Sequence, residues 1–264
     1  MNVLPLKQGI IYGPVDSRRL ERSLGVNLSP VTYKLCTFNC IYCHFGWTEC
    51  LTRDVSEHIK DFPTKEDIFL AVRSALESIA NLDYITFSGD GEPTLHPEFE
   101  SIVEGIKKIR DELTPETPLA ILSNSSMLKN ESVKGALAQI DVKILKLDAG
   151  IEEIFQKMNK PAAGISLQDI IEALKKEKNF VTQTLFVKGN VDNTDEKNLA
   201  KWIKAIASIS PKSVQIYSTD RPVPDAGIIK VGAKELKEIA HRTENETNVP
   251  VEVFSIERPI QADS

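Results

Sequence analysis

The feature that most limits the possible folds is a regular alternation of helix-spaced apolar residues with short β-type runs. Thr64 is expected to cap the first of these helices and Ser166 a later one. The predicted helical segments are 64–79, 99–109, 133–137, 166–174 and 199–209. The predicted strands are 25–33, 84–87, 119–122, 142–147, 180–187 and 213–217. Repeated units of this kind fold into a parallel sheet, either doubly wound or curved toward an incompletely closed barrel.

The composition excludes several other classes of protein. The 264 residues are 41% hydrophobic and 27% charged, which excludes a disordered chain, collagen and a coiled coil. A formal charge of −6 offers no overall attraction to a nucleic-acid backbone. No apolar run resembles a secretion signal or has the length of a membrane span, so we expect a cytoplasmic protein without a membrane partner. Cytosolic thiols stay reduced, and clustered ones are more often metal ligands than disulfides.

Three cysteines lie close together directly after the first predicted strand, at Cys36, Cys40 and Cys43. Spacing this tight rarely serves packing alone, so the loop is predicted to bind metal. Zinc could form a closed site with His44 or Cys50 as the fourth ligand. Zinc ligands usually come from two pairs that are separated in the sequence, whereas these cysteines share one loop. A cubane of four irons held by three thiolates therefore fits the loop better, and it leaves one iron open.

The C-x3-C-x2-C spacing, with Tyr42 before the last cysteine, resembles the signature of the radical S-adenosylmethionine (radical SAM) superfamily. The resemblance implies an α/β fold, a partial (β/α)6 TIM-like barrel of the radical SAM type. In that family a [4Fe-4S] cluster holds SAM on its fourth iron and passes it one electron. SAM is then cleaved to methionine and a 5'-deoxyadenosyl radical that abstracts a substrate hydrogen. A reducing donor such as flavodoxin or ferredoxin is the implied partner, and the implied cluster ligands are Cys36, Cys40 and Cys43.

A second signal follows the predicted strand 84–87, at the strand end where the sites of such sheets collect. The run Gly89-Asp90-Gly91-Glu92-Pro93 resembles the family's G-G-E-P element, whose backbone contacts the SAM amino group, and Asp90 stands in place of a glycine. Glu92 is expected to contribute its side chain, although an ordinary turn would explain the same glycines. The predicted cofactor-binding residues are Tyr42, Gly89, Asp90, Gly91, Glu92, Asn124, Asp148, Gln183 and Tyr217.

Longer stretches resemble the wyosine-synthetase-like branch of the superfamily, at 13–20, 24–28, 146–149, 183–187 and 215–222. Wyosine synthases modify a guanosine of tRNA and carry extra upstream cysteines for a second cluster, whereas residues 1–35 contain none. We therefore expect one cluster and a peptide, protein or small-molecule substrate ahead of tRNA. The alternatives are wyosine-type tRNA modification and a non-catalytic zinc or iron-sulfur protein.

Residues 1–24 are expected to be an N-terminal extension and 25–264 the core domain with C-terminal elements. The predicted substrate contacts are Arg18, Arg19, Lys146 and Arg221.

Overall fold

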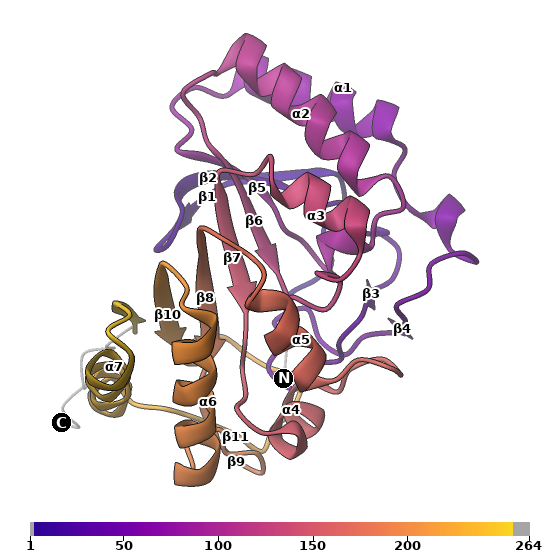
Figure 1. Cartoon of the computed structure of the whole chain (residues 1–264). Coiled ribbons are helices and arrows are strands. Elements are labelled where there is room, and N and C mark those ends of the chain that lie inside the picture. The colour runs from indigo at the N-terminus through magenta and orange to yellow at the C-terminus, as the bar shows by residue number, and fades with distance from the viewer. Residues whose placement is uncertain (1–2, 256–264) are drawn as a thin grey trace, which may run out of the picture.

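The computed structural model describes residues 3–255, and a sheet of eight strands runs through them (Figure 1). The strand order is β1-β2-β5-β6-β7-β8-β10-β12. Only the edge pair β1 and β2 is antiparallel, and every other neighbouring pair in this sheet is parallel. The strands of this sheet are β1 (Ile11–Ser17), β2 (Glu21–Val26), β5 (Tyr84–Phe87), β6 (Leu119–Ser123), β7 (Val142–Lys146), β8 (Phe180–Leu185), β10 (Ser213–Tyr217) and β12 (Val251–Phe254). Two short ribbons pair β3 (Leu35–Cys36) with β4 (Cys50–Leu51) and β9 (Val187–Gly189) with β11 (Ile228–Lys230).

The α-helices cover the outer face of the curved sheet, with α1 and α2 toward one edge and α6 and α7 toward the other (Figure 1). They are α1 (Lys65–Ser78), α2 (Phe99–Leu113), α3 (Glu131–Leu137), α4 (Glu152–Asn159), α5 (Leu167–Leu174), α6 (Glu196–Ile209) and α7 (Ala233–Thr247). The two predicted N-caps are confirmed. The Thr64 hydroxyl accepts from the Asp67 amide at 3.2 Å, and the Ser166 hydroxyl accepts from the Asp169 amide at 3.1 Å.

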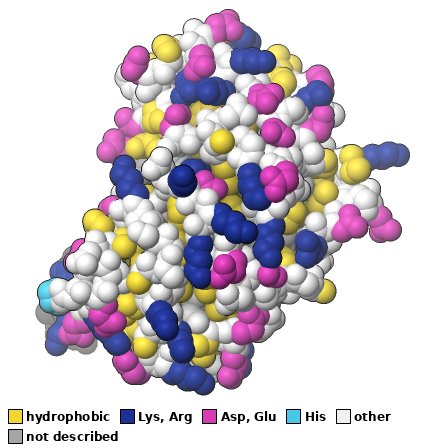
Figure 2. All heavy atoms as spheres, viewed as in Figure 1, with side chains coloured by type: hydrophobic (Ala, Val, Ile, Leu, Met, Phe, Trp, Pro, Cys, Tyr) yellow, Lys and Arg dark blue, Asp and Glu magenta, His cyan; other side chains and the backbone are white. Residues whose placement is uncertain are grey.

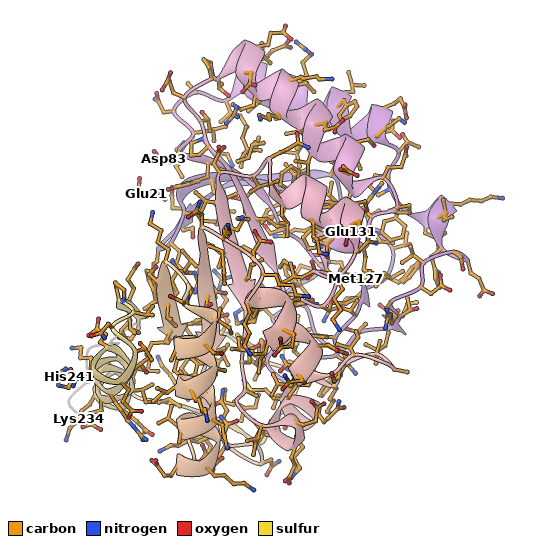
Figure 3. All side chains as sticks on the ribbon, viewed as in Figure 1. Glu21, Asp83, Met127, Glu131, Lys234 and His241 are labelled. Carbon is orange, nitrogen blue, oxygen red and sulfur yellow. The ribbon has the colours of Figure 1, made fainter. Side chains whose placement is uncertain are left out.

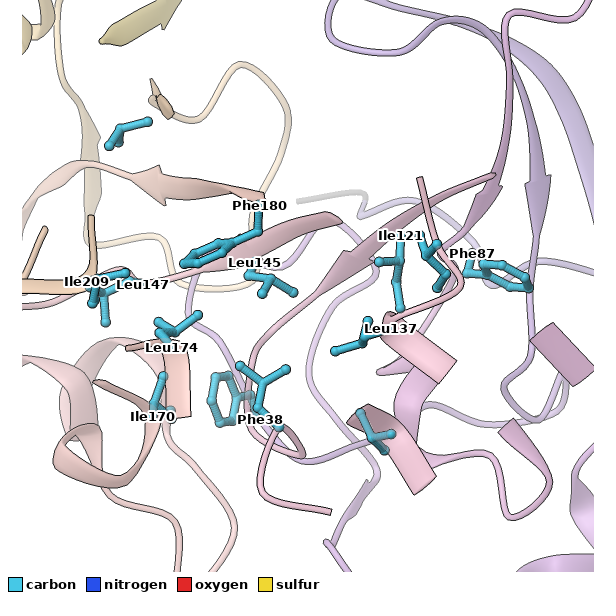
Figure 4. Close-up of a cluster of buried hydrophobic side chains, with 14 of the residues drawn as sticks. Phe38, Phe87, Ile121, Leu137, Leu145, Leu147, Ile170, Leu174, Phe180 and Ile209 are labelled. Carbon is cyan, nitrogen blue, oxygen red and sulfur yellow. The ribbon is translucent and has the colours of Figure 1, made fainter. Parts of the chain in front are cut away.

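Alternation of side chains along each strand divides the apolar residues into two groups. One face packs against the helices and forms the main core, which Figure 4 shows between Phe87, Ile121, Leu145 and Phe180 on the strands and the helices beside them. The inner face is lined by a smaller group, in which Leu20 from the β1–β2 turn packs on Ala120 and Ile144. The turn therefore fills part of the barrel interior.

The same turn also reaches the far side of the open barrel. Arg18 donates to Asp220 at 3.0 Å, and the Arg19 guanidinium lies 4.6 Å from the centre of the Tyr217 ring. Tyr217 ends β10, which lies near the opposite edge of the sheet from β1. The hairpin thus spans the gap that six βα units leave.

The predicted α/β barrel of six βα units is confirmed, and three local differences stand beside it. The first parallel strand covers Glu21–Val26 rather than 25–33, because the Asn27 side chain accepts from the Ser29 amide at 3.2 Å and turns the chain. The segment predicted as one strand at 180–187 divides into β8 and β9. Several elements were not predicted at all, namely the strands β1, β3, β4, β11 and β12 and the helices α4 and α7.

Acidic and basic side chains are both spread over the face viewed in Figure 2, and several basic ones lie close together near its middle. Glu21 and Asp83 lie together where β2 and β5 begin (Figure 3), at the opposite ends of these strands from Val26 and Phe87. Within residues 3–255, none of the helices has both the length and the apolar character needed to cross a bilayer.

Candidate functional site

A cavity of about 230 Å³ opens at the carboxyl ends of the parallel strands. Residues that end or follow β5, β6, β7, β8 and β10 all contribute to its wall, as expected for a sheet of this type. The structure brings most of the predicted site residues together here. Those lining the cavity are Cys36, Cys40, Tyr42, Cys43, Gly89, Asp90, Gly91, Glu92, Asn124, Lys146, Gln183 and Tyr217.

The cysteine loop is fixed by backbone hydrogen bonds to the end of α4. The amide of Asn39 donates to the Asn159 carbonyl at 2.9 Å, and the amide of Ile41 donates to the Met158 carbonyl at 3.0 Å. Burial raises the pKa of the Cys36 thiol to about 12 and that of Cys40 to about 11. Thiols with such raised pKa values do not ionise readily by themselves. They are suited to be metal ligands, because a bound metal compensates the charge of the thiolates.

The fourth cysteine points to the other side of the loop. In the parallel β3–β4 ribbon, Cys50 pairs with Leu35 and Cys36 pairs with Leu51. Since paired residues share a face and successive residues alternate, Cys50 lies on the face opposite to Cys36. Its sulfur contacts the His58 Nε2 at 3.2 Å instead. Cys50 is therefore not placed to complete a closed site with the other three thiols.

The two candidate metal centres make different demands on the positions of their sulfur ligands. Within residues 3–255, no three His, Cys, Asp or Glu side chains converge closely enough to hold one metal ion. A tetrahedral zinc needs its sulfurs about 2.3 Å from a single atom, whereas each thiolate of a cubane binds a different iron. The three thiols Cys36, Cys40 and Cys43 line one cavity.

Close backbone approach explains the glycines after β5. A Cβ on Gly91 would lie 2.1 Å from the Leu35 carbonyl oxygen, and a Cβ on Gly89 would lie 2.1 Å from the Asn27 Oδ1. Leu35 directly precedes the first loop cysteine, so Gly91 lets the two loops touch. The glycines thus do more than make a turn.

The two carboxylates of this element have different surroundings. Both Glu92 oxygens are engaged inside the protein, since Oε2 accepts from the Asn124 amide at 2.7 Å and Oε1 accepts from Ser123 and Thr94. Glu92 therefore joins the loops that follow β5 and β6. Asp90 accepts from the Lys7 amide through Oδ2, but its Oδ1 is buried without a partner among the described residues. An orphaned acceptor in the cavity wall is suited to an ammonium donor of a bound molecule.

A buried polar network lies beside the cysteines. Asp148 accepts from the hydroxyl of Tyr42, from Asn159 Nδ2 at 3.0 Å and from the Leu185 amide at 2.9 Å. Asp148 also lies 3.2 Å from Lys146 Nζ. Burial alone would lower the pKa of Lys146, but Asp148 and the Tyr217 hydroxyl raise it above its usual value. Lys146 is therefore a permanent cation in the cavity wall, with Asp148 behind it.

Asn159 connects this network to the cysteine loop, and nothing in its local sequence predicts that contact. Its Nδ2 also lies 3.5 Å from the Cys40 sulfur, a distance at which it can donate to a thiolate. Asn124 Nδ2 lies 3.7 Å from the Cys36 sulfur in the same way. Several other residues of the cavity wall were not predicted as cofactor or substrate contacts, and Lys34 and His44 are among them.

Basic groups gather around His44 at one side of the cavity. Burial lowers the pKa of His44, and the charges of Arg221, Lys146 and Arg19 lower it further. The Nδ1 of His44 and the Nη1 of Arg19 are both buried without hydrogen-bond partners among the described residues. Arg18, by contrast, is paired with Asp220. The four predicted substrate contacts therefore differ in their surroundings. The charges of Arg19, Lys146 and Arg221 act on His44, whereas that of Arg18 is paired with Asp220.

Comparison with known proteins agrees with the class of site that this geometry defines. The family model of the Radical SAM superfamily matches residues 31–214, so the chain belongs to that superfamily. A UPF0026 protein of Synechocystis sp. is 33% identical over 224 residues, which are 81% of this chain and 77% of that protein. The chain is thus also a member of the UPF0026 family.

Other relatives are longer than this chain. A protein of Brachyspira hyodysenteriae named GTPase Obg is 28% identical over 95% of the chain, which spans 36% of that protein. A UPF0026 protein of Methanocaldococcus jannaschii is 30% identical over 81% of the chain, which spans 64% of that protein.

Solved structures share the fold at low sequence identity. SuiB of Streptococcus suis, in a crystal structure bound to S-adenosylmethionine, has a TM-score of 0.61 and 13% identity, over 88% of this chain and 50% of that one. TYW1 with a lysine-pyruvate adduct bound has a TM-score of 0.53 and 14% identity, over 86% of this chain and 75% of that one. These likenesses confirm the partial barrel.

Proposed function

We propose that Cys36, Cys40 and Cys43 hold a single [4Fe-4S] cluster, against which SAM binds in the adjoining cavity. The observation that carries this proposal is the division of the four thiols: three line one cavity, and Cys50 lies on the other face of the ribbon. Bound there, the cluster and SAM would supply one-electron cleavage of SAM and a radical able to abstract hydrogen. A closed set of four ligands would leave no iron for SAM.

Different residues of the chain are proposed to bind the amino group and the carboxylate of SAM. Asp90 Oδ1 and the backbone of Gly89–Gly91 provide acceptors for the amino group, because the acceptor of Asp90 is orphaned and buried. Lys146 provides a cation for the carboxylate, and its ion pair with Asp148 holds it in position. Asn124 and Asn159 donate toward two of the sulfurs and so stabilise them as thiolates.

The substrate is proposed to be a peptide, protein or small molecule, and a reducing protein such as flavodoxin or ferredoxin to be the electron donor. Wyosine-type tRNA modification is the less favoured candidate. The likeness to TYW1 supports the fold alone, and residues 1–35 have no cysteine that could hold a second cluster.

The test compares two cysteine variants of the anaerobically purified protein. Cys36→Ala is expected to lose iron, the brown colour and conversion of SAM to 5'-deoxyadenosine under strong reductant, whereas Cys50→Ala keeps all three. The two variants remove the same atom from neighbouring strands, but Cys36 is buried and Cys50 only partly so, and circular dichroism therefore has to show that Cys36→Ala is folded. Zinc in place of iron, or loss of the cluster in Cys50→Ala, would contradict the proposal.

A further inference from the structure

A second group of reactive side chains lies on the outer face of the cysteine loop, away from the cavity. Cys50 on β4 contacts His58 Nε2 at 3.2 Å, and the other ring nitrogen, Nδ1, lies 2.9 Å from the Tyr33 hydroxyl. Tyr33 in turn lies 2.5 Å from Asp61 Oδ2, in the short 3-10 helix Ile59–Asp61. The four side chains are therefore linked by hydrogen bonds from a thiol to a carboxylate, and His58 Nδ1 also lies 3.4 Å from Asp61 Oδ2.

The roles of Tyr33 and Asp61 decide which groups of this network donate a proton and which accept one. Burial and Asp61 raise the pKa of Tyr33, so the phenol keeps its proton, and the Tyr33 hydrogen bond lowers the pKa of Asp61. Tyr33 therefore donates to Asp61 and presents its oxygen lone pair to His58 Nδ1–H. That bond leaves His58 Nε2 as an acceptor, facing the Cys50 thiol.

This arrangement is a nucleophile beside a base that a third group orients. Burial and Asp61 raise the pKa of Cys50, so the thiol needs a base in order to react at neutral pH. Cys50 packs against the cluster of Leu35, Phe62 and Leu95 and is only partly buried, as access of a small reagent requires.

The surroundings of the sulfur favour one kind of reagent. An acyl donor would need N–H groups to stabilise an oxyanion, but the amides of Cys50 and Thr52 are already bonded to the carbonyls of Lys34 and Cys36. A hydroperoxide needs only a nucleophile and a proton donor for its leaving oxygen.

We propose that Cys50 and His58 form a second reactive site, which reduces a small hydroperoxide and converts Cys50 to a sulfenic acid. His58 accepts the thiol proton, and the sulfur attacks the terminal oxygen of the peroxide. The O–O bond breaks, and the leaving oxygen takes the proton from His58 to give water or an alcohol. Sulfur loses two electrons, and the peroxide gains them.

The test measures oxidation of Cys50 in the anaerobically purified protein with hydrogen peroxide as the probe. Sulfenic acid is trapped with dimedone, and the modified peptide is quantified by mass spectrometry, which separates Cys50 from the cavity cysteines whether or not they hold a cluster. General-base catalysis contributes about 10²-fold or more, so His58→Ala should slow the reaction by that factor. Added imidazole should restore much of the rate, which a merely structural role of His58 would not allow.

Three further variants complete the design. His58→Gln keeps a hydrogen-bonding side chain of similar length but no base, and it should also be slow, which covers the case in which His58→Ala is unstable. Tyr33→Phe should give a smaller loss, because it removes only the group that orients His58. His241→Gln, on the outer side of α7 (Figure 3), should match the wild type. Equal rates for the wild type and both His58 variants, or a wild-type rate no faster than that of the chain in urea, would overturn the proposal.

Discussion

Replacing Asp148 by Asn should destabilise the protein more than any change to an exposed ion pair. The Asp148 side chain is 1% exposed, and it is the counter-ion of Lys146 at 3.2 Å. An amide at this position still accepts from the Leu185 amide, but it leaves the ammonium group without a charge partner. Removing one partner of a buried pair costs about 3–5 kcal/mol.

The lower end of that range applies here. The Lys146 side chain is 18% exposed, so the orphaned ammonium can be partly hydrated. We therefore expect the free energy of unfolding to fall by about 3 kcal/mol, which is a decrease in Tm of about 6–12 °C for a domain of this size. Lys146→Met should cost less, because Asp148 keeps its donors from Tyr42, Asn159 and Leu185.

Chemical denaturation followed by circular dichroism measures both changes. The matched control is Glu153→Gln, which removes the carboxylate of an exposed pair with Lys157. Exposed pairs of this kind contribute little, so the control should leave the midpoint almost unchanged. The reasoning fails if Asp148→Asn shifts the midpoint no more than Glu153→Gln does, or if Lys146→Met is the more damaging of the two buried changes.

Three other predictions follow from the site and its surroundings. Gly91→Ala should lose iron and SAM cleavage, because the new Cβ would lie 2.1 Å from the Leu35 carbonyl oxygen; normal iron content would show that the loops can separate. Burial lowers the pKa of His96, so the unfolded chain binds a proton there that the folded chain does not, and stability should fall as the pH drops below about 6.5. His96→Gln should remove that part of the pH dependence, as denaturant midpoints at pH 7 and pH 5 would reveal. Iron should match one cubane per chain, and a mobility-shift titration should detect no salt-sensitive tRNA binding; tight, salt-sensitive binding would restore the wyosine-type alternative.

Much of the fold could be predicted because its strands are short apolar runs between helices of clear periodicity. The strands at 84–87, 119–122 and 213–217 were predicted to within a residue of β5, β6 and β10. The hairpin strand β1 contains Pro14, a residue that argues against a strand unless the strand lies at a sheet edge, as β1 does. Whether a strand lies at an edge depends on the assembled sheet, and the local sequence pattern does not indicate it.

The candidate site shows the same limit. Cys36, Cys40 and Cys43 share a loop, so their spacing predicts their proximity without knowledge of the fold. Asn159 lies more than a hundred residues further along, and only the packing of α4 against the loop brings its amide to Cys40. An asparagine at the end of a helix carries no signal that separates this role from an ordinary one.

The length of the segment between Cys43 and Cys50 has a chemical consequence. In the β3–β4 ribbon, a slip of one residue would pair Cys50 with Cys36 and turn its sulfur toward the cavity. In the centre that we propose, this fourth thiol would then compete for the coordination position left open to SAM. A single insertion or deletion in residues 44–49 could thus convert a reactive centre into an inert one, although no cysteine would be lost from the sequence. The same change would move the Cys50 thiol away from His58.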